Sequence, residues 1–129
     1  YVNEPLREKA RNPPTSGALR PAGPAEGHPI AEADIRDRAV LAMVNEAARV
    51  LEDGIVPGPG DVDLGMITGT GFPPFRGGLL RYADTRGLPS VVQRLEDLSL
   101  RYGTRFEPAP LLRRYIDEGR TFYASDATA

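Results

Sequence analysis

Residues 34–54, with the sequence DIRDRAVLAMVNEAARVLEDG, carry the clearest periodicity in the chain. Their apolar side chains recur at the i, i+3, i+4 and i+7 spacing that is typical of an amphipathic α-helix. These side chains are Ala39, Val40, Met43, Val44, Ala47, Val50 and Leu51. Asp34 suits the positive end of the helix dipole, Gly54 suits a C-terminal cap, and we expect Glu46 on the partly buried face. The stretch therefore predicts a long amphipathic helix.

Shorter helical segments follow this helix along the chain. We expect them from a cap at Asp61 to Gly69, from Leu79 to Arg86, from Pro89 to Gly103, and from Pro108 to Gly119. The alternation of period two that marks half-buried strands does not occur. The sequence therefore predicts an all-α fold, a small helical bundle of about five helices.

Residues 69–78, GTGFPPFRGG, form the least regular part of this region. Four glycines and two prolines exclude regular helix or strand, and the spacing matches neither the dinucleotide fingerprint nor the P-loop. The favoured interpretation is structural: Phe72 and Phe75 fill apolar gaps, while the prolines, Pro73 among them, stiffen the turn. The alternative is that Arg76 and the glycine amides line a groove for a ligand or for another domain.

The two ends of the chain differ in composition from its centre. Residues 1–30 hold six prolines and three glycines without apolar periodicity, which predicts an irregular linker to something upstream. The helical domain is expected over residues 31–123, and the small, polar residues 124–129 are expected to fray. The chain also begins with Tyr1, so we interpret it as a piece of a longer protein.

Composition argues against several kinds of site. A net charge of -2 offers no basic field for nucleic acid, and without cysteine there is no disulfide, thiolate zinc site or cysteine nucleophile. The one histidine, His28, lies in the predicted linker without a pocket or partner, and no apolar run approaches the length of a membrane span. We therefore predict no catalytic, cofactor-binding or metal-binding residue in this chain.

Three long segments occur in the order and spacing of one known family. They are DIRDRAVLAMVNEAARVLEDGIV at 34–56, DVDLGMITGTGFPPFRGGLLRYADTRG at 61–87 and EPAPLLRRYIDEGRTFY at 107–123. The chain resembles the C-terminal domain of 3-hydroxyacyl-CoA dehydrogenases. The pattern GxGFPPFxGGxxxYxD at 69–84 is similar, more narrowly, to the second C-terminal repeat in the α-subunit of the bacterial fatty-acid oxidation complex and its mitochondrial and peroxisomal relatives.

The resemblance implies a multifunctional enzyme of lipid metabolism, acting in fatty-acid β-oxidation. Such proteins combine an enoyl-CoA hydratase region, an NAD-binding Rossmann domain and two helical repeats, and oxidise 3-hydroxyacyl-CoA to 3-ketoacyl-CoA. This chain would be the last repeat, with the other domains as partners and acyl-CoA nearby. NAD would be the cofactor of the whole enzyme and not of this chain. Whether a thiolase subunit also binds is left open. The implied location is the cytoplasm for a bacterial protein, and mitochondria or peroxisomes for a eukaryotic one.

The chain departs from the family at one informative place. The catalytic repeat carries an Asn directly before an Arg at the start of its first helix, and the matching pair here is Asp37 and Arg38. An aspartate cannot donate a hydrogen bond to a substrate oxygen, and it opposes a developing oxyanion. The resemblance therefore implies a structural repeat that packs on the catalytic repeat and the NAD domain.

In that interpretation, six residues are candidates for interface or architectural roles. They are Arg38, Glu46, Phe72, Pro73, Phe75 and Arg76. Two alternatives stay open. The chain could contact acyl-CoA at the domain junction through the GFPPFRGG loop, or it could be an independent interaction domain.

Overall fold

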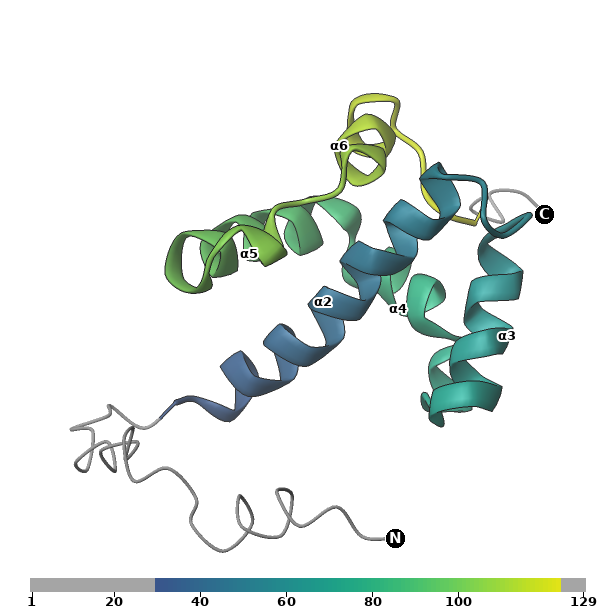
Figure 1. Ribbon diagram of the computed structural model, residues 1–129, viewed down its shortest axis with the longest axis horizontal. Coiled ribbons are helices and arrows are strands. Elements are labelled where there is room, and N and C mark those ends of the chain that lie inside the picture. Colours follow the sequence, from purple (N-terminus) through teal and green to yellow (C-terminus); the bar gives the residue numbers. More distant parts are fainter. Residues whose placement is uncertain (1–29, 124–129) are drawn as a thin grey trace, which may run out of the picture. The chain divides into compact units, whose positions relative to one another are not determined.

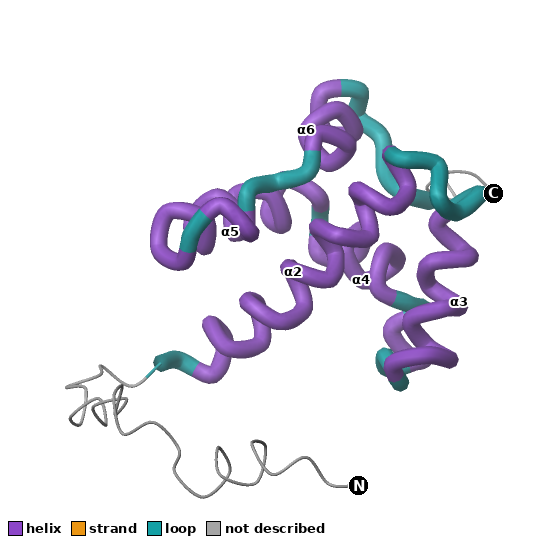
Figure 2. The backbone as a smooth tube through the Cα atoms, viewed as in Figure 1, coloured by secondary structure: helices purple, strands orange, loops and turns teal. Residues whose placement is uncertain are grey.

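The computed structural model describes residues 30–123 (Figure 1). The linker predicted for the N-terminal segment, with His28, and the frayed tail predicted at 124–129 lie outside the described residues, apart from Ile30. Within the described part the chain forms helices and loops, without a strand (Figure 2). The α-helices are α2 (Glu32–Glu52), α3 (Pro59–Thr70), α4 (Leu79–Arg86), α5 (Leu88–Tyr102) and α6 (Pro110–Asp117); the 3₁₀ turns are η1 (Pro74–Arg76) and η2 (Thr104–Phe106). The predicted all-α fold of about five helices is confirmed.

Helix α2 is the central element, because α4, α5, α6 and η2 all contact it. Its side chains at Leu41, Val44 and Ala48 are fully buried. The predicted stripe is partly wrong, since Ala39 and Glu46 are exposed. The reason is that α4, α5 and α6 pack on the face of α2 that carries Leu41, Val44 and Ala48, while Met43, Glu46 and Val50 lie beside an open groove between α2 and α3.

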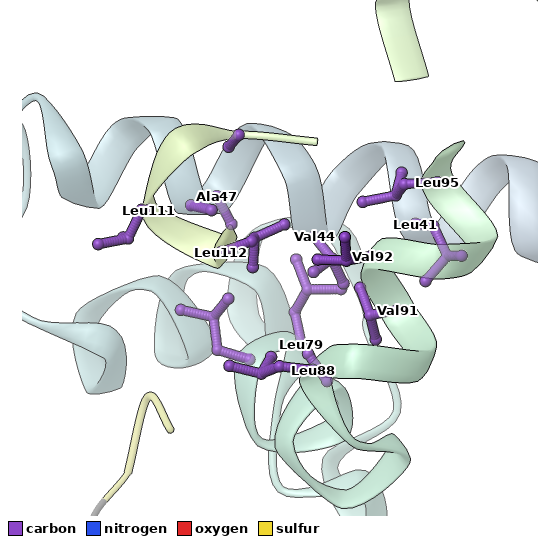
Figure 3. Close-up of a cluster of buried hydrophobic side chains, with 14 of the residues drawn as sticks. Leu41, Val44, Ala47, Leu79, Leu88, Val91, Val92, Leu95, Leu111 and Leu112 are labelled. Carbon is purple, nitrogen blue, oxygen red and sulfur yellow. The ribbon is translucent and has the colours of Figure 1, made fainter. Parts of the chain in front are cut away.

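The core lies where α2, α4, α5 and α6 converge (Figure 3). Its fully buried large side chains are Leu41, Val44, Leu79, Leu80, Val91, Leu95, Leu98 and Leu112. Burial of one such side chain stabilises the fold by about 1.5–3 kcal/mol. These contacts join residues from both halves of the domain, so the helices form one packed unit.

Helix α3 differs from its predicted bounds at both ends. It begins at Pro59 and not at Asp61, because proline fits the first helical turn, where its missing N–H has no partner to lose. It ends at Thr70 and not at Gly69, because Gly71 adopts the left-handed conformation with φ of 71°. Asp61 therefore lies in the first turn of the helix.

Candidate functional site

The GFPPFRGG loop holds its two phenylalanines in opposite environments. Phe72 is 9% exposed and meets the edge of Tyr82, with ring centroids 6.4 Å apart. Phe75 was also expected to fill a gap, but it lies 82% exposed. Pro73 precedes the η1 turn and is exposed. The loop is therefore anchored to the core at one aromatic ring and presents the other outward.

Arg76 follows Phe75 in the same turn and is exposed. Its guanidinium lies 5.6 Å from the ring centroid of Phe75 and 5.8 Å from that of Tyr82. Cation–π contact at exposed sites contributes about 0.5–1 kcal/mol. The loop tip thus presents an aromatic ring and a cation side by side.

Asp63 joins this loop to the next helix. Its side chain is almost fully buried, where Oδ1 accepts from the Leu80 N–H at 2.6 Å and Oδ2 from the Arg81 N–H at 3.1 Å. These bonds satisfy amides in the first turn of α4. The sequence predicted a helix cap at Asp61; the structure shows that Asp63, two residues further on, caps α4 and not its own helix.

Gly78 is required by this cap. It adopts φ of 116°, which side chains rarely allow, and a Cβ there would overlap Cβ and Cγ of Asp63 and lie 2.6 Å from Oδ2. The second glycine of the Gly77–Gly78 pair therefore lets the Asp63 carboxylate reach the start of α4.

Asp84, the last residue of the sequence pattern, fixes the C-terminal segment. Its carboxylate accepts from the N–H groups of Phe122 at 3.0 Å and Tyr123 at 2.9 Å. The Tyr123 hydroxyl donates to Asp63 Oδ2 at 2.7 Å, and Arg81 lies over the Tyr123 ring at 3.9 Å. Burial, followed by the bond to Asp63, raises the pKa of the Tyr123 hydroxyl. The pattern therefore describes a chain of contacts that ties α3, α4 and the C-terminal segment together.

Asn45 is a buried polar residue that sequence reasoning missed. It is 1% exposed, donates to the Glu107 carbonyl at 2.8 Å and accepts from the Ala109 N–H at 2.7 Å. Arg49 donates to the same carbonyl at 3.1 Å. The available signal was an asparagine in the middle of an otherwise apolar helical face. Asn45 therefore holds the link between η2 and α6 against α2.

Asp37, which the sequence resemblance matched with a catalytic asparagine, accepts hydrogen bonds at both of its side-chain oxygens. Arg86 donates to both of its oxygens, at 2.7 and 3.1 Å, and Arg94 Nε donates to Oδ2 at 2.9 Å. Arg94 also pairs with Asp34. The hydrogen bond from Arg86 is the largest cause that holds the pKa of the Asp37 carboxyl below its usual range; burial opposes it, and the hydrogen bond from Arg94 adds to it. The carboxylate is therefore charged, paired and structural.

This pairing predicts the effect of Asp37→Asn. We expect the variant to lose about 1–2 kcal/mol of unfolding free energy at neutral pH, because an amide cannot replace charged bonds to two arginines. The folded-state pKa lies below 3.8, so the stabilisation is complete above that value and is lost as the pH falls through the folded pKa. Urea unfolding at several pH values should show a constant difference from wild type above about pH 5 that shrinks below about pH 4.

The exposed Asp97 on α5 provides the control for this comparison. Asp97→Asn is expected to change stability by less than about 0.5 kcal/mol. Equal stability of Asp37→Asn and wild type at neutral pH would contradict a stabilising role for the bonds from Arg86 and Arg94 to Asp37.

Arg38, the neighbour of Asp37, turns to a different side of α2. Its guanidinium lies 4.1 Å from the centroid of the Tyr102 ring at the end of α5. Asp37 and Arg38 therefore make separate contacts and do not share a site. Glu46 pairs with Arg49 at 3.3 Å on the surface.

An apolar groove of about 390 Å³ runs between α2 and α3. We call it the α2–α3 groove; its lining is Met43, Glu46, Ala47, Val50, Val56, Asp61, Val62, Gly65 and Met66. Glu46 and Asp61 are the only charged residues in this lining. Gly65 leaves space in the groove, because no atom lies within 4 Å of where its Cβ would be. The groove is thus a concave apolar surface of the kind that receives a partner helix.

Residues 35–128 match the family of the 3-hydroxyacyl-CoA dehydrogenase C-terminal domain. The chain belongs to this family. It is 50% identical over 100 residues to a fatty acid oxidation complex subunit alpha of Shewanella amazonensis, covering 78% of this chain and 14% of that protein. A subunit alpha of Vibrio parahaemolyticus is 47% identical over 94 residues, covering 73% and 13%.

A solved structure shows the same fold. FadB2 of M. tuberculosis superposes with a TM-score of 0.59 and 25% identity, covering 67% of this chain and 32% of that one. The chain spans about a seventh of the length of the curated relatives it matches. The resemblance inferred from the sequence is confirmed.

Two further properties of the domain concern membranes and metals. Between residues 30 and 123, no helix combines the length and apolarity needed to cross a bilayer. In the same described region, no three residues of the His, Cys, Asp or Glu types gather into an arrangement suited to a metal ion.

Proposed function

We propose that this 3-hydroxyacyl-CoA dehydrogenase C-terminal domain is a non-catalytic repeat within a longer fatty-acid β-oxidation protein. The observation that carries the proposal is the state of Asp37. Its carboxyl is ionised, so the side chain has no donor to offer a substrate carbonyl. Both of its oxygens instead accept hydrogen bonds from Arg86 and Arg94. The residue at the catalytic asparagine position holds helices together instead.

The longer protein would oxidise 3-hydroxyacyl-CoA to 3-ketoacyl-CoA with NAD, as the family implies. The described residues of this domain do not fit NAD, because a dinucleotide is held by a strand, a glycine-rich turn and a helix, and residues 30–123 contain no strand. NAD would therefore be bound by another domain of the longer protein. Its bacterial relatives support a cytoplasmic protein. A thiolase subunit as a further partner stays a prediction from the resemblance.

The domain would act by packing on the first helical repeat and the NAD domain. The α2–α3 groove supports this role, since its side walls at Val50, Val62 and Met66 are apolar and half-buried. Apolar area of this kind gains free energy when a partner covers it, at about 25 cal/mol per Å². Phe75, a large exposed ring in the short η1 turn, is the natural second anchor at an interface.

A binding experiment with matched variants tests the packing role. A fragment with the NAD domain and first repeat of the same polypeptide would be titrated into this chain by calorimetry. We expect binding by the wild type and at least about a tenfold loss for Met66→Glu, because the groove would have to bury an unpaired charge. Leu64→Glu places the same charge on an exposed position of α3 outside the groove and should change affinity less than about threefold.

Thermal unfolding of each variant establishes that it is folded. Equal losses for the Met66 and Leu64 variants would remove the α2–α3 groove from the interface. Absence of binding by the folded wild-type chain would contradict the packing role itself.

A further inference from the structure

A second concave surface lies closer to the N-terminus of α2 than the α2–α3 groove does. It has a volume of about 450 Å³ and is lined by Ile35, Arg38, Ala39, Ala42, Arg105 and Phe106. We call it the Arg38–Arg105 cleft. One wall is a single face of α2, since its four residues there follow helical spacing, and the other is η2. The volume falls within the range of about 300–1,000 Å³ that is usual for small-ligand pockets.

Most of the cleft surface is hydrocarbon. Phe106 is buried behind it and meets the edge of Tyr102, with centroids 6.3 Å apart. Ala39 and Ala42 add small side chains that leave the space open, and Ile35 is an exposed branched residue at the rim. The apolar part of the cleft can therefore hold a short hydrocarbon chain.

Two arginine side chains, those of Arg38 and Arg105, also line the cleft. The guanidinium of Arg38 lies 4.1 Å from the Tyr102 ring centroid, and that of Arg105 lies 4.9 Å from the Phe106 ring centroid. A guanidinium held over a ring loses side-chain freedom, but its N–H groups stay free to donate in the plane of the guanidinium. Both guanidiniums are thus oriented by aromatic rings and not by acids.

The acidic residues near the start of α2 pair with arginines that do not line this cleft. Asp34 and Asp37 pair with Arg86 and Arg94, and Glu32 pairs with Arg36. Among residues 30–123, neither Arg38 nor Arg105 forms a salt bridge, so their charges are not neutralised within the described part of the domain. An anion in the cleft would meet two cations and no competing carboxylate from its lining residues.

We propose that the Arg38–Arg105 cleft binds a small amphipathic anion, a short hydrocarbon chain that ends in a carboxylate or a phosphate. The hydrocarbon lies against Ala39, Ala42 and Phe106, and the anionic oxygens accept hydrogen bonds from the two guanidiniums. Arginine suits either head group, because its planar N–H fork matches two oxygens of a carboxylate or a phosphate. The cleft is too small for a long chain and a large head group together.

The test is an NMR titration of the full 129-residue chain with four probes: octanoate, octyl phosphate, octanol and inorganic phosphate. We expect octanoate and octyl phosphate to shift the amide signals of α2 and η2 around the cleft, and the tighter of the two identifies the head group. Octanol and inorganic phosphate should bind at least about tenfold more weakly, because each lacks one half of the recognised chemistry. Octanol binding as tightly as octanoate, or shifts confined to other surfaces, would overturn the proposal.

Variants separate the two arginines from general charge effects. Arg38→Gln and Arg105→Gln are each expected to weaken octanoate binding about threefold to tenfold. Arg120→Gln is the matched control, since Arg120 also lies over a ring, that of Tyr115 at 4.8 Å, but outside the cleft; its affinity should equal that of wild type.

Ala39→Leu provides a second test of binding in the cleft, and it leaves both arginine charges in place. Ala39 is exposed on α2 and lines the cleft, so leucine keeps the helix and fills the space for the ligand chain. We expect weaker binding of octanoate by at least about fivefold with unchanged thermal stability. Unchanged affinity in this variant and in both arginine variants would overturn the proposal.

Discussion

Gly78→Ala is expected to destabilise the domain by about 3–6 kcal/mol, a large part of the total stability of a protein this size. Two costs add together. The backbone at this position has φ of 116°, and the new methyl group would overlap the side chain of Asp63. Asp63 cannot move aside without releasing the N–H groups of Leu80 and Arg81, which it caps from a buried position. Thermal unfolding should show a fall in Tm of more than about 10 °C, or no cooperative transition.

Gly103→Ala isolates the backbone cost. Gly103 also has positive φ, at 101°, but no atom lies within 4 Å of its added Cβ. We expect a loss of about 1–2 kcal/mol there. Equal losses at both glycines would show that contact with Asp63 is not what requires Gly78.

Asn45→Ala is expected to lower the free energy of unfolding by about 2–4 kcal/mol. The substitution leaves the buried N–H of Ala109 without a partner, while the Glu107 carbonyl keeps the bond from Arg49. It also detaches the segment between η2 and α6 from the middle of α2. Denaturant unfolding, read at the midpoint concentration with an unchanged m-value, measures this loss.

Glu46→Ala is the adjacent control for that measurement. Glu46 is exposed and pairs only with Arg49 on the surface, so its removal should cost less than about 0.5 kcal/mol. An effect at position 46 as large as that at position 45 would contradict the assignment of Asn45 as the bridge to Ala109.

The helices could be predicted because their signals are local. The apolar repeat at 34–54 and glycines such as Gly54 and Gly103 act over one or two turns. The burial of α2 was predicted less well, since Ala39 and Glu46 belong to the right helix but face solvent. Which face is buried depends on where α4, α5 and α6 pack, and periodicity alone does not contain that information.

The polar contacts that hold the domain together could not be predicted in the same way. Asn45 bonds to groups 62 and 64 positions away, and Asp63 to groups 17 and 18 positions away. The family resemblance identified Asp37 as a departure, but its partners Arg86 and Arg94 follow only from the packing of α2 against α4 and α5. The exposure of Phe75 beside the buried Phe72 likewise depends on the path of a short loop and not on residue type.

The most direct test of the central claim, that this domain contributes packing and not chemistry, is NADH oxidation with acetoacetyl-CoA. Three samples would be compared: this chain, a fragment with the NAD domain and first helical repeat, and the two mixed. The account predicts no turnover by this chain and a higher rate for the fragment after mixing. Turnover by this chain alone, or an unchanged rate on mixing with the folded domain, would contradict it.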